Sequence, residues 1–127
     1  MPHLDAIGLV SADMKESVRF YRLLGLELPE ATDDHIEATL PSGLRVMFDA
    51  VSLMKQLDPG WTTPSGHPFA LAFACASPKE VDDCYARITA AGFRGRTAPF
   101  DAFWGHRYAT VLDPDGNAVD LFAPLPK

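Results

Sequence analysis

The stretch that decides the fold is AIGLVSADMKESVRFYRLLG (6–25), because ALAFACASPKEVDDCYARIT (70–89) repeats its pattern 64 residues later. Each copy opens with an alternating apolar run, which predicts a β-strand. A small polar residue then precedes an acid by three positions, at Asp13 and at Ser77. This spacing is typical of the capping box that begins a helix. Each copy therefore predicts a strand followed directly by a helix.

The repeat continues beyond the helices, which carry apolar residues at helical spacing and end at Gly25 and Gly92. HIEATL (35–40) resembles HRYATV (106–111), and each precedes a turn rich in proline and glycine. The turns lead into the last strands, LRVMFDAV (44–51) and NAVDLFA (117–123), and short strands at 27–31 and 94–98 complete the pattern. The sequence thus predicts an α+β fold of two tandem βαβββ modules.

The chain is predicted to be one domain over residues 1–127. Module one covers about 3–51 and module two about 69–124. The polar stretch between them, about 52–68, is predicted to be a linker or lid with Trp61 in its middle. A length of 127 residues is enough for a hydrophobic core without disulfides or a structural metal.

Composition narrows the range of partners. The net charge of −6 argues against nucleic acid and anionic membranes and is compatible with a cationic ligand. No apolar run approaches the roughly 20 residues of a membrane span, and no signal peptide is recognised at the N-terminus, so we expect a cytoplasmic protein. Cys75 and Cys84 fit no metal or redox spacing and are expected to be reduced core residues.

The chain resembles the vicinal oxygen chelate superfamily, which includes glyoxalase I, bleomycin-resistance proteins, fosfomycin-resistance enzymes and extradiol dioxygenases. The resemblance rests on residues 6–25 and on WGHRYATVLDPDGNAVDLF (104–122), and it covers nearly the whole chain. It implies that the two mixed sheets form a cup with the helices packed outside. It also implies a homodimer, and in the metal-using members four His and Glu ligands from the first and last strand of each module.

The positions that match these family ligands carry residues of other types: Ala6, Met47, Ala70 and Asp120. Alanine cannot coordinate a metal, methionine is a poor ligand for hard divalent ions, and one carboxylate alone does not make a site. We therefore expect no metal and no other cofactor.

Strand alternation indicates which side chains line the cup instead. Bulky residues in the first strand of each module alternate with alanine and glycine, so the small face, with room left over, should face the ligand. We apply the same alternation to the other strands and add the aromatic residues near the strand ends and in the linker. The candidate ligand-binding residues are Asp120, Trp104, Tyr108, His106, Glu37, Met47, Asp49, Phe103 and Trp61.

Three functions are compatible with this site. The first is metal-independent binding of a small organic molecule, cationic or aromatic, as in the drug-sequestering bleomycin-resistance-type proteins that the chain resembles. The second is a glyoxalase-like lyase or isomerase, or a dioxygenase-type enzyme, with an atypical site in which Asp120 acts with His106 or Tyr108. The third is an accessory subunit that binds a metabolite.

Overall fold

The structure is a computed structural model that describes residues 1–64 and 70–127. The chain forms two compact units, Met1–Ser65 and Gly66–Lys127, and each is described here by itself. The boundary falls in the stretch predicted as a linker. The end of that linker, 65–68, and the predicted start of module two at 69 lie outside the described residues.

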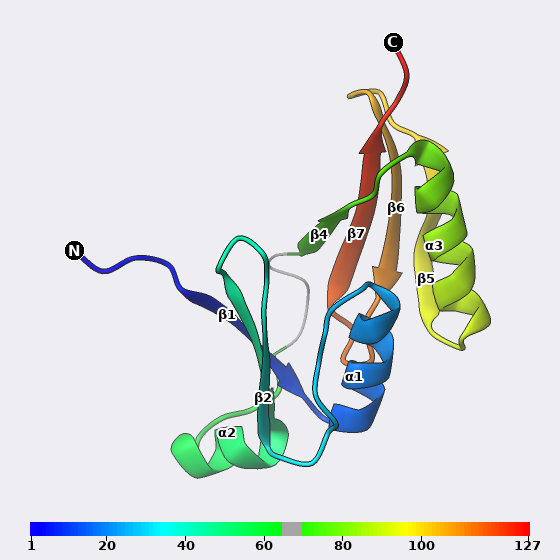
Figure 1. The fold of residues 1–127 in the computed structure, drawn as a ribbon. Coiled ribbons are helices and arrows are strands. Elements are labelled where there is room, and N and C mark those ends of the chain that lie inside the picture. The colour runs from blue at the N-terminus through cyan, green and yellow to red at the C-terminus, as the bar shows by residue number, and fades with distance from the viewer. Residues whose placement is uncertain (65–69) are drawn as a thin grey trace. The chain divides into compact units, whose positions relative to one another are not determined.

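Unit 1 (Met1–Ser65) contains a three-stranded mixed sheet in the order β1-β3-β2 (Figure 1). Strand β3 lies in the centre, parallel to β1 and antiparallel to β2. Its elements are β1 (Ala6–Ser11), α1 (Met14–Leu23), β2 (His35–Thr39), β3 (Arg45–Ala50) and α2 (Val51–Leu57).

Unit 2 (Gly66–Lys127) contains a four-stranded mixed sheet in the order β4-β7-β6-β5. Its elements are β4 (Leu71–Ala74), α3 (Pro78–Ala90), β5 (Arg94–Asp101), β6 (His106–Leu112) and β7 (Ala118–Pro124). Strand β7 is parallel to β4 and antiparallel to β6, so β4, β6 and β7 repeat the arrangement of β1, β2 and β3. The predicted α+β fold with an internal repeat is confirmed.

The capping residues read from the sequence begin both long helices. Asp13 accepts a hydrogen bond from the backbone N–H of Glu16, and Ser77 accepts one from that of Glu80. Gly25 and Gly92, with φ of 88° and 96°, follow the helix ends in the left-handed conformation that favours glycine. Among the described residues, no helix combines the length and the apolar composition that a membrane span needs.

The strand predicted at 27–31 is wrong. This segment is irregular, and among the described residues the sheet of unit 1 has no counterpart of β5. Leu26 and Leu28 are buried and alternate as in a strand, but Pro29 has no N–H to donate to a sheet. The carbonyl of Leu28 instead accepts a hydrogen bond of 2.8 Å from Nη2 of Arg22.

The description of 52–68 as only a linker or lid also needs correction, because residues 51–57 form the helix α2. The helix also takes Val51, which the sequence had assigned to the preceding strand. Ala50, at the N-cap position, makes no side-chain capping bond, so the usual signal of a helix start is missing. Trp61 lies beyond α2, where its backbone N–H bonds the carbonyl of Asp58.

Strand β5 is longer than predicted and irregular. It runs to Asp101, and its pairing with β6 shifts register between Gly95 and Thr97 and again between Thr97 and Phe100. Gly95 sits under the ring of Tyr85 on α3, where an added Cβ would lie 2.0 Å from the tyrosine hydroxyl. The glycine thus makes room for a tyrosine between helix and sheet.

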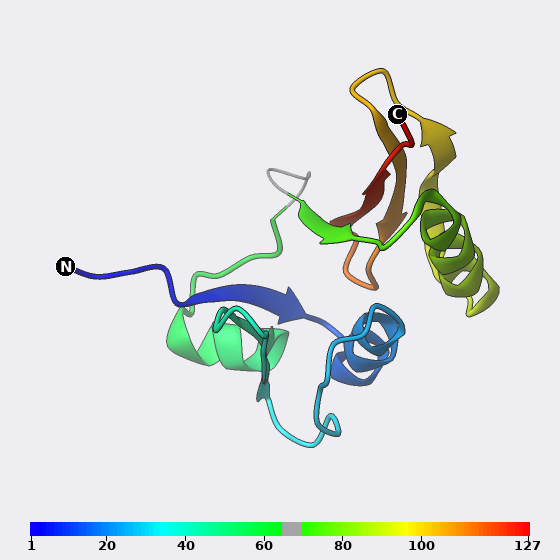
Figure 2. The ribbon, with the colours of Figure 1, turned by 45° about the horizontal axis from the view of Figure 1, so that its top comes forward.

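Each sheet uses one face for the core. Figures 1 and 2 show α3 along one face of the sheet of unit 2, where alternate residues of β6 and β7 are fully buried: Ala109, Val111, Val119, Leu121 and Ala123. In unit 1 the corresponding residues of β2 and β3 are Ile36, Ala38, Val46 and Phe48, with the ring of Tyr21 from α1 against Phe48. The residues between them belong to the opposite face.

Both cysteines are free, as predicted from their spacing. Cys84, on α3, is buried, and Cys75, just after β4, is half-buried. Burial raises the pKa of the Cys75 thiol to about 11 and raises that of Cys84 as well, so both are thiols rather than thiolates at neutral pH.

The side chain of Asp113 reinforces the hairpin between β6 and β7, which backbone hydrogen bonds from Asp113 to Asn117 and from Gly116 to Asp113 also close. The carboxylate of Asp113, only 5% exposed, accepts hydrogen bonds from the backbone N–H groups of Asp115 and Asn117 and from Nδ2 of Asn117. A buried carboxylate with several donors is a strong local constraint, because removal of it leaves those donors without a partner.

Replacement of Asp113 by alanine should therefore lower the free energy of unfolding by about 2 to 4 kcal/mol. Urea unfolding followed by circular dichroism measures the change. Asp33→Ala removes the same charge from an exposed position and should have an effect within about 0.5 kcal/mol. Equal losses in the two variants would mean that net charge, not the hairpin, sets the effect.

Candidate functional site

The candidate residues occupy the sheet faces opposite the core. In unit 1 this face carries a row of charged side chains, and in unit 2 it carries mainly aromatic ones. The parallel strand pairs of the two sheets are in equivalent register: Gly8 pairs with Met47 in unit 1, and Ala72 pairs with Asp120 in unit 2. Gly8, Ala72 and Ala74 are exposed, in agreement with the small face that strand alternation predicts.

In unit 1, five side chains of alternating charge form what we call the charge chain: Asp5, Arg45, Glu37, His35 and Asp49. Arg45 donates to Asp5 from Nη2 at 2.7 Å and to both carboxylate oxygens of Glu37 from Nη1 at 2.9 and 3.0 Å. His35 continues the chain from its two ring nitrogens, to Glu37 at 3.0 Å and to Asp49 at 2.5 Å. Two predicted ligand-binding acids, Glu37 and Asp49, thus already have partners inside unit 1.

The charge chain shifts the acid–base behaviour of its members. Ionised carboxylates can only accept hydrogen bonds, so His35 bonds both acids only when both of its ring nitrogens carry a proton. Its bonds to Asp49 and then to Glu37 accordingly raise the pKa of His35 above its usual 6.5. In turn His35 and Arg45 lower the pKa of Glu37.

Met47 is the remaining candidate on this face. It lies between Gly8 and Glu37 in the sheet, and its Cε is 3.8 Å from the place where a Cβ on Gly8 would be. The methyl end of Met47 therefore lies at van der Waals distance from that place, so a Cβ on residue 8 would contact it without a clash.

In unit 2, a turn between β5 and β6 presents two of the predicted aromatic residues. The backbone N–H of Gly105 bonds the carbonyl of Ala102, and Gly105 has φ of 91°, so the turn is tight. Phe103 at its tip is 97% exposed, and Trp104 is 46% exposed. The centroids of these two rings are 5.1 Å apart, with their planes at 90°.

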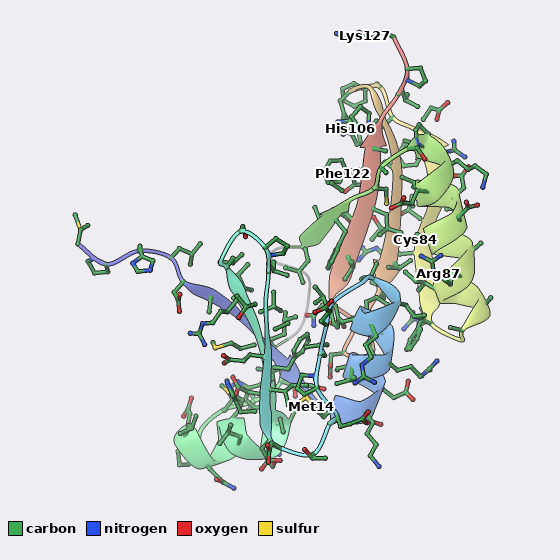
Figure 3. All side chains as sticks on the ribbon, in the orientation of Figure 1. Met14, Cys84, Arg87, His106, Phe122 and Lys127 are labelled. Atoms are coloured by element: carbon green, nitrogen blue, oxygen red, sulfur yellow. The ribbon has the colours of Figure 1, made fainter. Side chains whose placement is uncertain are left out.

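Trp104 also contacts the open sheet face. Its Nε1 donates a hydrogen bond of 3.2 Å to Nδ1 of His106, and its ring lies 5.3 Å from that of Tyr108. The His106 ring in turn lies 5.2 Å from the ring of Phe122 on β7, as the two labelled side chains in Figure 3 illustrate. The bond from Trp104 requires that Nδ1 of His106 is unprotonated.

Asp120 lies on the same face, next to Tyr108. Its Oδ1 accepts a hydrogen bond of 2.8 Å from the hydroxyl of Thr110. Burial, and then a hydrogen bond with Asp120, raise the pKa of Tyr108 to about 12. Tyr108 is therefore protonated at neutral pH and can donate a proton or a hydrogen bond, but it cannot serve there as a base.

The structure brings together four of the predicted residues, Trp104, His106, Tyr108 and Asp120, in unit 2, with Phe103 at the adjoining turn. It brings together Glu37, Met47 and Asp49 in unit 1. Trp61 lies on the segment after α2. Thr110 and Phe100 also belong to the open face of unit 2, but neither was among the ligand-binding candidates.

Two further features were not foreseen. Arg107 pairs with Asp82 of α3 and with Asp101 of β5. A groove of about 470 Å³ lies in unit 1, apart from the predicted site residues. It is lined by Lys15, Val18, Arg19, Arg22, Glu30, Ala31 and Thr32.

The residues at the family's metal-ligand positions do not fit a divalent cation. Ala6 and Ala70 have no donor atoms, and Met47 offers only a thioether. Asp120 is the one oxygen ligand of the four, and it already accepts a hydrogen bond from Thr110. Elsewhere in residues 1–64 and 70–127, no group of three or more His, Cys, Asp or Glu side chains is placed to hold a metal ion.

A duplicated strand–helix–strand unit with a mixed sheet, one face of which is left open, defines the class of protein. The model of the Glyoxalase/Bleomycin resistance protein/Dioxygenase superfamily matches residues 3–121. The chain belongs to this superfamily. No curated protein sequence matches it significantly.

Solved structures share this fold. A glyoxalase/bleomycin resistance protein/dioxygenase from Nocardioides is 27% identical with a TM-score of 0.76, over 98% of this chain and 85% of the other. A glyoxalase-related enzyme from Fulvimarina pelagi is 24% identical with a TM-score of 0.82, over 97% and 88% of the two chains. A family enzyme from Burkholderia phytofirmans PsJN is 22% identical with a TM-score of 0.79, over 98% and 100%.

The charge chain leads to a prediction on pH. Because the folded state raises the pKa of His35, its contribution to stability is complete below about pH 6.5 and is lost as pH rises through the folded-state pKa. The melting-temperature difference between the native chain and His35→Gln should thus shrink from pH 6 to pH 9. Titration of the His35 ring by NMR should give a pKa above 6.5, and Asp49→Asn should lower it more than Glu37→Gln does. A pKa at or below 6.5 would contradict the charge chain.

Proposed function

We propose that this superfamily member binds a small organic molecule without a metal ion, and that the ligand carries an aromatic or cationic group. The observation that carries the proposal is the open face of unit 2, where half-exposed rings adjoin a carboxylate. Trp104 is 46% exposed and its ring lies 5.3 Å from that of Tyr108, and Asp120 lies on the same face, two residue pairs further along the strands from Tyr108. Aromatic faces beside an acid attract flat and positively charged groups.

The residues at the family's metal positions support binding rather than metal-assisted chemistry. Two alanines, a methionine and one aspartate cannot polarise a substrate oxygen through a divalent ion. The alternative of acid–base catalysis by Asp120 with Tyr108 has less support, since a tyrosine with a pKa of about 12 is a weak acid at neutral pH.

Three probes of one size test the proposal by calorimetry: 1-methylquinolinium (cationic), quinoline (uncharged at neutral pH) and quinoline-4-carboxylate (anionic). The cation should bind most tightly and the anion most weakly, because Asp120 lies beside the rings. Binding should be unchanged after dialysis against EDTA. At 100 times its Kd, a ligand raises the free energy of unfolding by about 2.7 kcal/mol, which a thermal-shift assay detects.

Asp120→Asn should weaken binding of 1-methylquinolinium about five- to tenfold and leave that of quinoline nearly unchanged. The asparagine oxygen still accepts the bond from Thr110, so the fold should be retained. Asp83→Asn, on the exposed surface of α3, removes the same charge as a matched control. Tightest binding of the anion, loss of binding in EDTA, or no binding of any probe would refute the proposal.

A further inference from the structure

We infer that the rings of Phe100, Trp104 and Tyr108 form a receptor for a methylated ammonium group, and we call these three residues the aromatic corner. The inference deepens the proposed function and rests on it, because it names the chemical class of the ligand at the same face. Phe100 is essential to it, because its ring lies next to those of both Trp104 and Tyr108.

The three ring planes are almost mutually perpendicular. The plane of Phe100 makes angles of 88° with Trp104 and 74° with Tyr108, and the planes of Trp104 and Tyr108 meet at 79°. In the inferred receptor, the three rings are the walls of one inner corner. A flat ligand can stack on only one of these walls, whereas a compact, nearly spherical group can contact all three.

The separations of Phe100 from the other two rings suit a cation of this size, whereas Trp104 and Tyr108 lie closer together, at 5.3 Å. A cation roughly 4.5 Å above the faces of two perpendicular rings holds their centroids about 6 Å apart. The centroid of Phe100 is 6.4 Å from that of Trp104 and 6.1 Å from that of Tyr108. Trp104 and Phe100 are 46% and 40% exposed, so the corner is accessible from solvent.

The charges near the corner favour a cation. Asp120 lies opposite Thr110, two residues along β6 from Tyr108, and Thr110, which donates a hydrogen bond to Asp120, is neutral. Arg107 alternates with Tyr108 along β6 and therefore belongs to the face that packs on α3. It pairs with Asp82 and Asp101, so its positive charge is already compensated.

The walls also favour a methylated ammonium over a bare one. Aromatic rings cannot replace the hydrogen bonds that water gives to N–H groups, so transfer of a primary ammonium into the corner carries a large desolvation cost. A trimethylammonium group has no N–H to lose, and its methyl groups bury apolar surface against the rings.

Choline and its uncharged isostere 3,3-dimethylbutan-1-ol test the inference on the native full-length chain by calorimetry. The two molecules have the same shape, so the difference in affinity measures the charge alone. Choline should bind about tenfold more tightly than the isostere, and more tightly than ethanolamine, which has the bare ammonium. Equal binding of choline and the isostere, or of choline and ethanolamine, would overturn the inference.

Parallel titration with 1-methylquinolinium separates this inference from the proposed function. Binding of the flat cation without binding of choline would refute the aromatic corner and leave the proposed function intact. Binding of neither would refute both.

Substitution at Trp104 tests the corner itself. Trp104→Leu should weaken choline binding about tenfold, whereas Trp104→Tyr keeps an aromatic wall and should restore most of the affinity. Circular dichroism checks that both variants fold. An equal loss in both variants, or none in either, would contradict a role for the aromatic face.

Discussion

The structure depends on the division of each sheet into a face that must be apolar and a face that is free to vary. In unit 2 the side chains of β6 and β7 that face α3, such as Val111 and Leu121, are fully buried. Every second residue of these strands is thereby committed to the core, and burial of each large one is worth roughly 1.5 to 3 kcal/mol. The residues that alternate with them are not needed for the core, and the candidate site consists of these residues.

The two units show how far the free face can diverge. Through the strand pairing, His35 and Asp49 in unit 1 occupy positions that correspond to Tyr108 and Phe122 in unit 2, and Met47 corresponds to Asp120. On this face, unit 1 carries the charge chain, in which acidic and basic side chains pair with each other, whereas unit 2 carries aromatic rings next to Asp120. The core residues of both copies, by contrast, are mainly apolar, and the buried Ser11 and Ser17 in unit 1 hydrogen-bond to each other. The repeat thus preserves what folding needs and varies what binding uses.

Most of the fold could be predicted from the sequence, because capping residues, glycine stops and strand alternation are local signals. The errors arose where a local signal was missing or misleading: α2 has no side-chain cap, and the alternation of Leu26 and Leu28 imitates a strand that Pro29 interrupts. The site was predicted less completely. Phe100 joins Trp104 and Tyr108 only because β5 shifts register twice, and no sequence pattern gives the position of such shifts. The partners of Glu37 and Asp49 likewise depend on distances between strands.

The fit between Gly95 and Tyr85 ties together two positions that lie on different elements. Any side chain at 95 requires the tyrosine ring to leave its place on the sheet, whereas loss of the ring would leave a gap above the glycine. Substitution of either residue alone therefore disturbs the packing between helix α3 and strand β5. In descendants of this sequence, we expect both residues to be retained or both to be replaced together. Covariation between the helix and strand β5 would record this dependence.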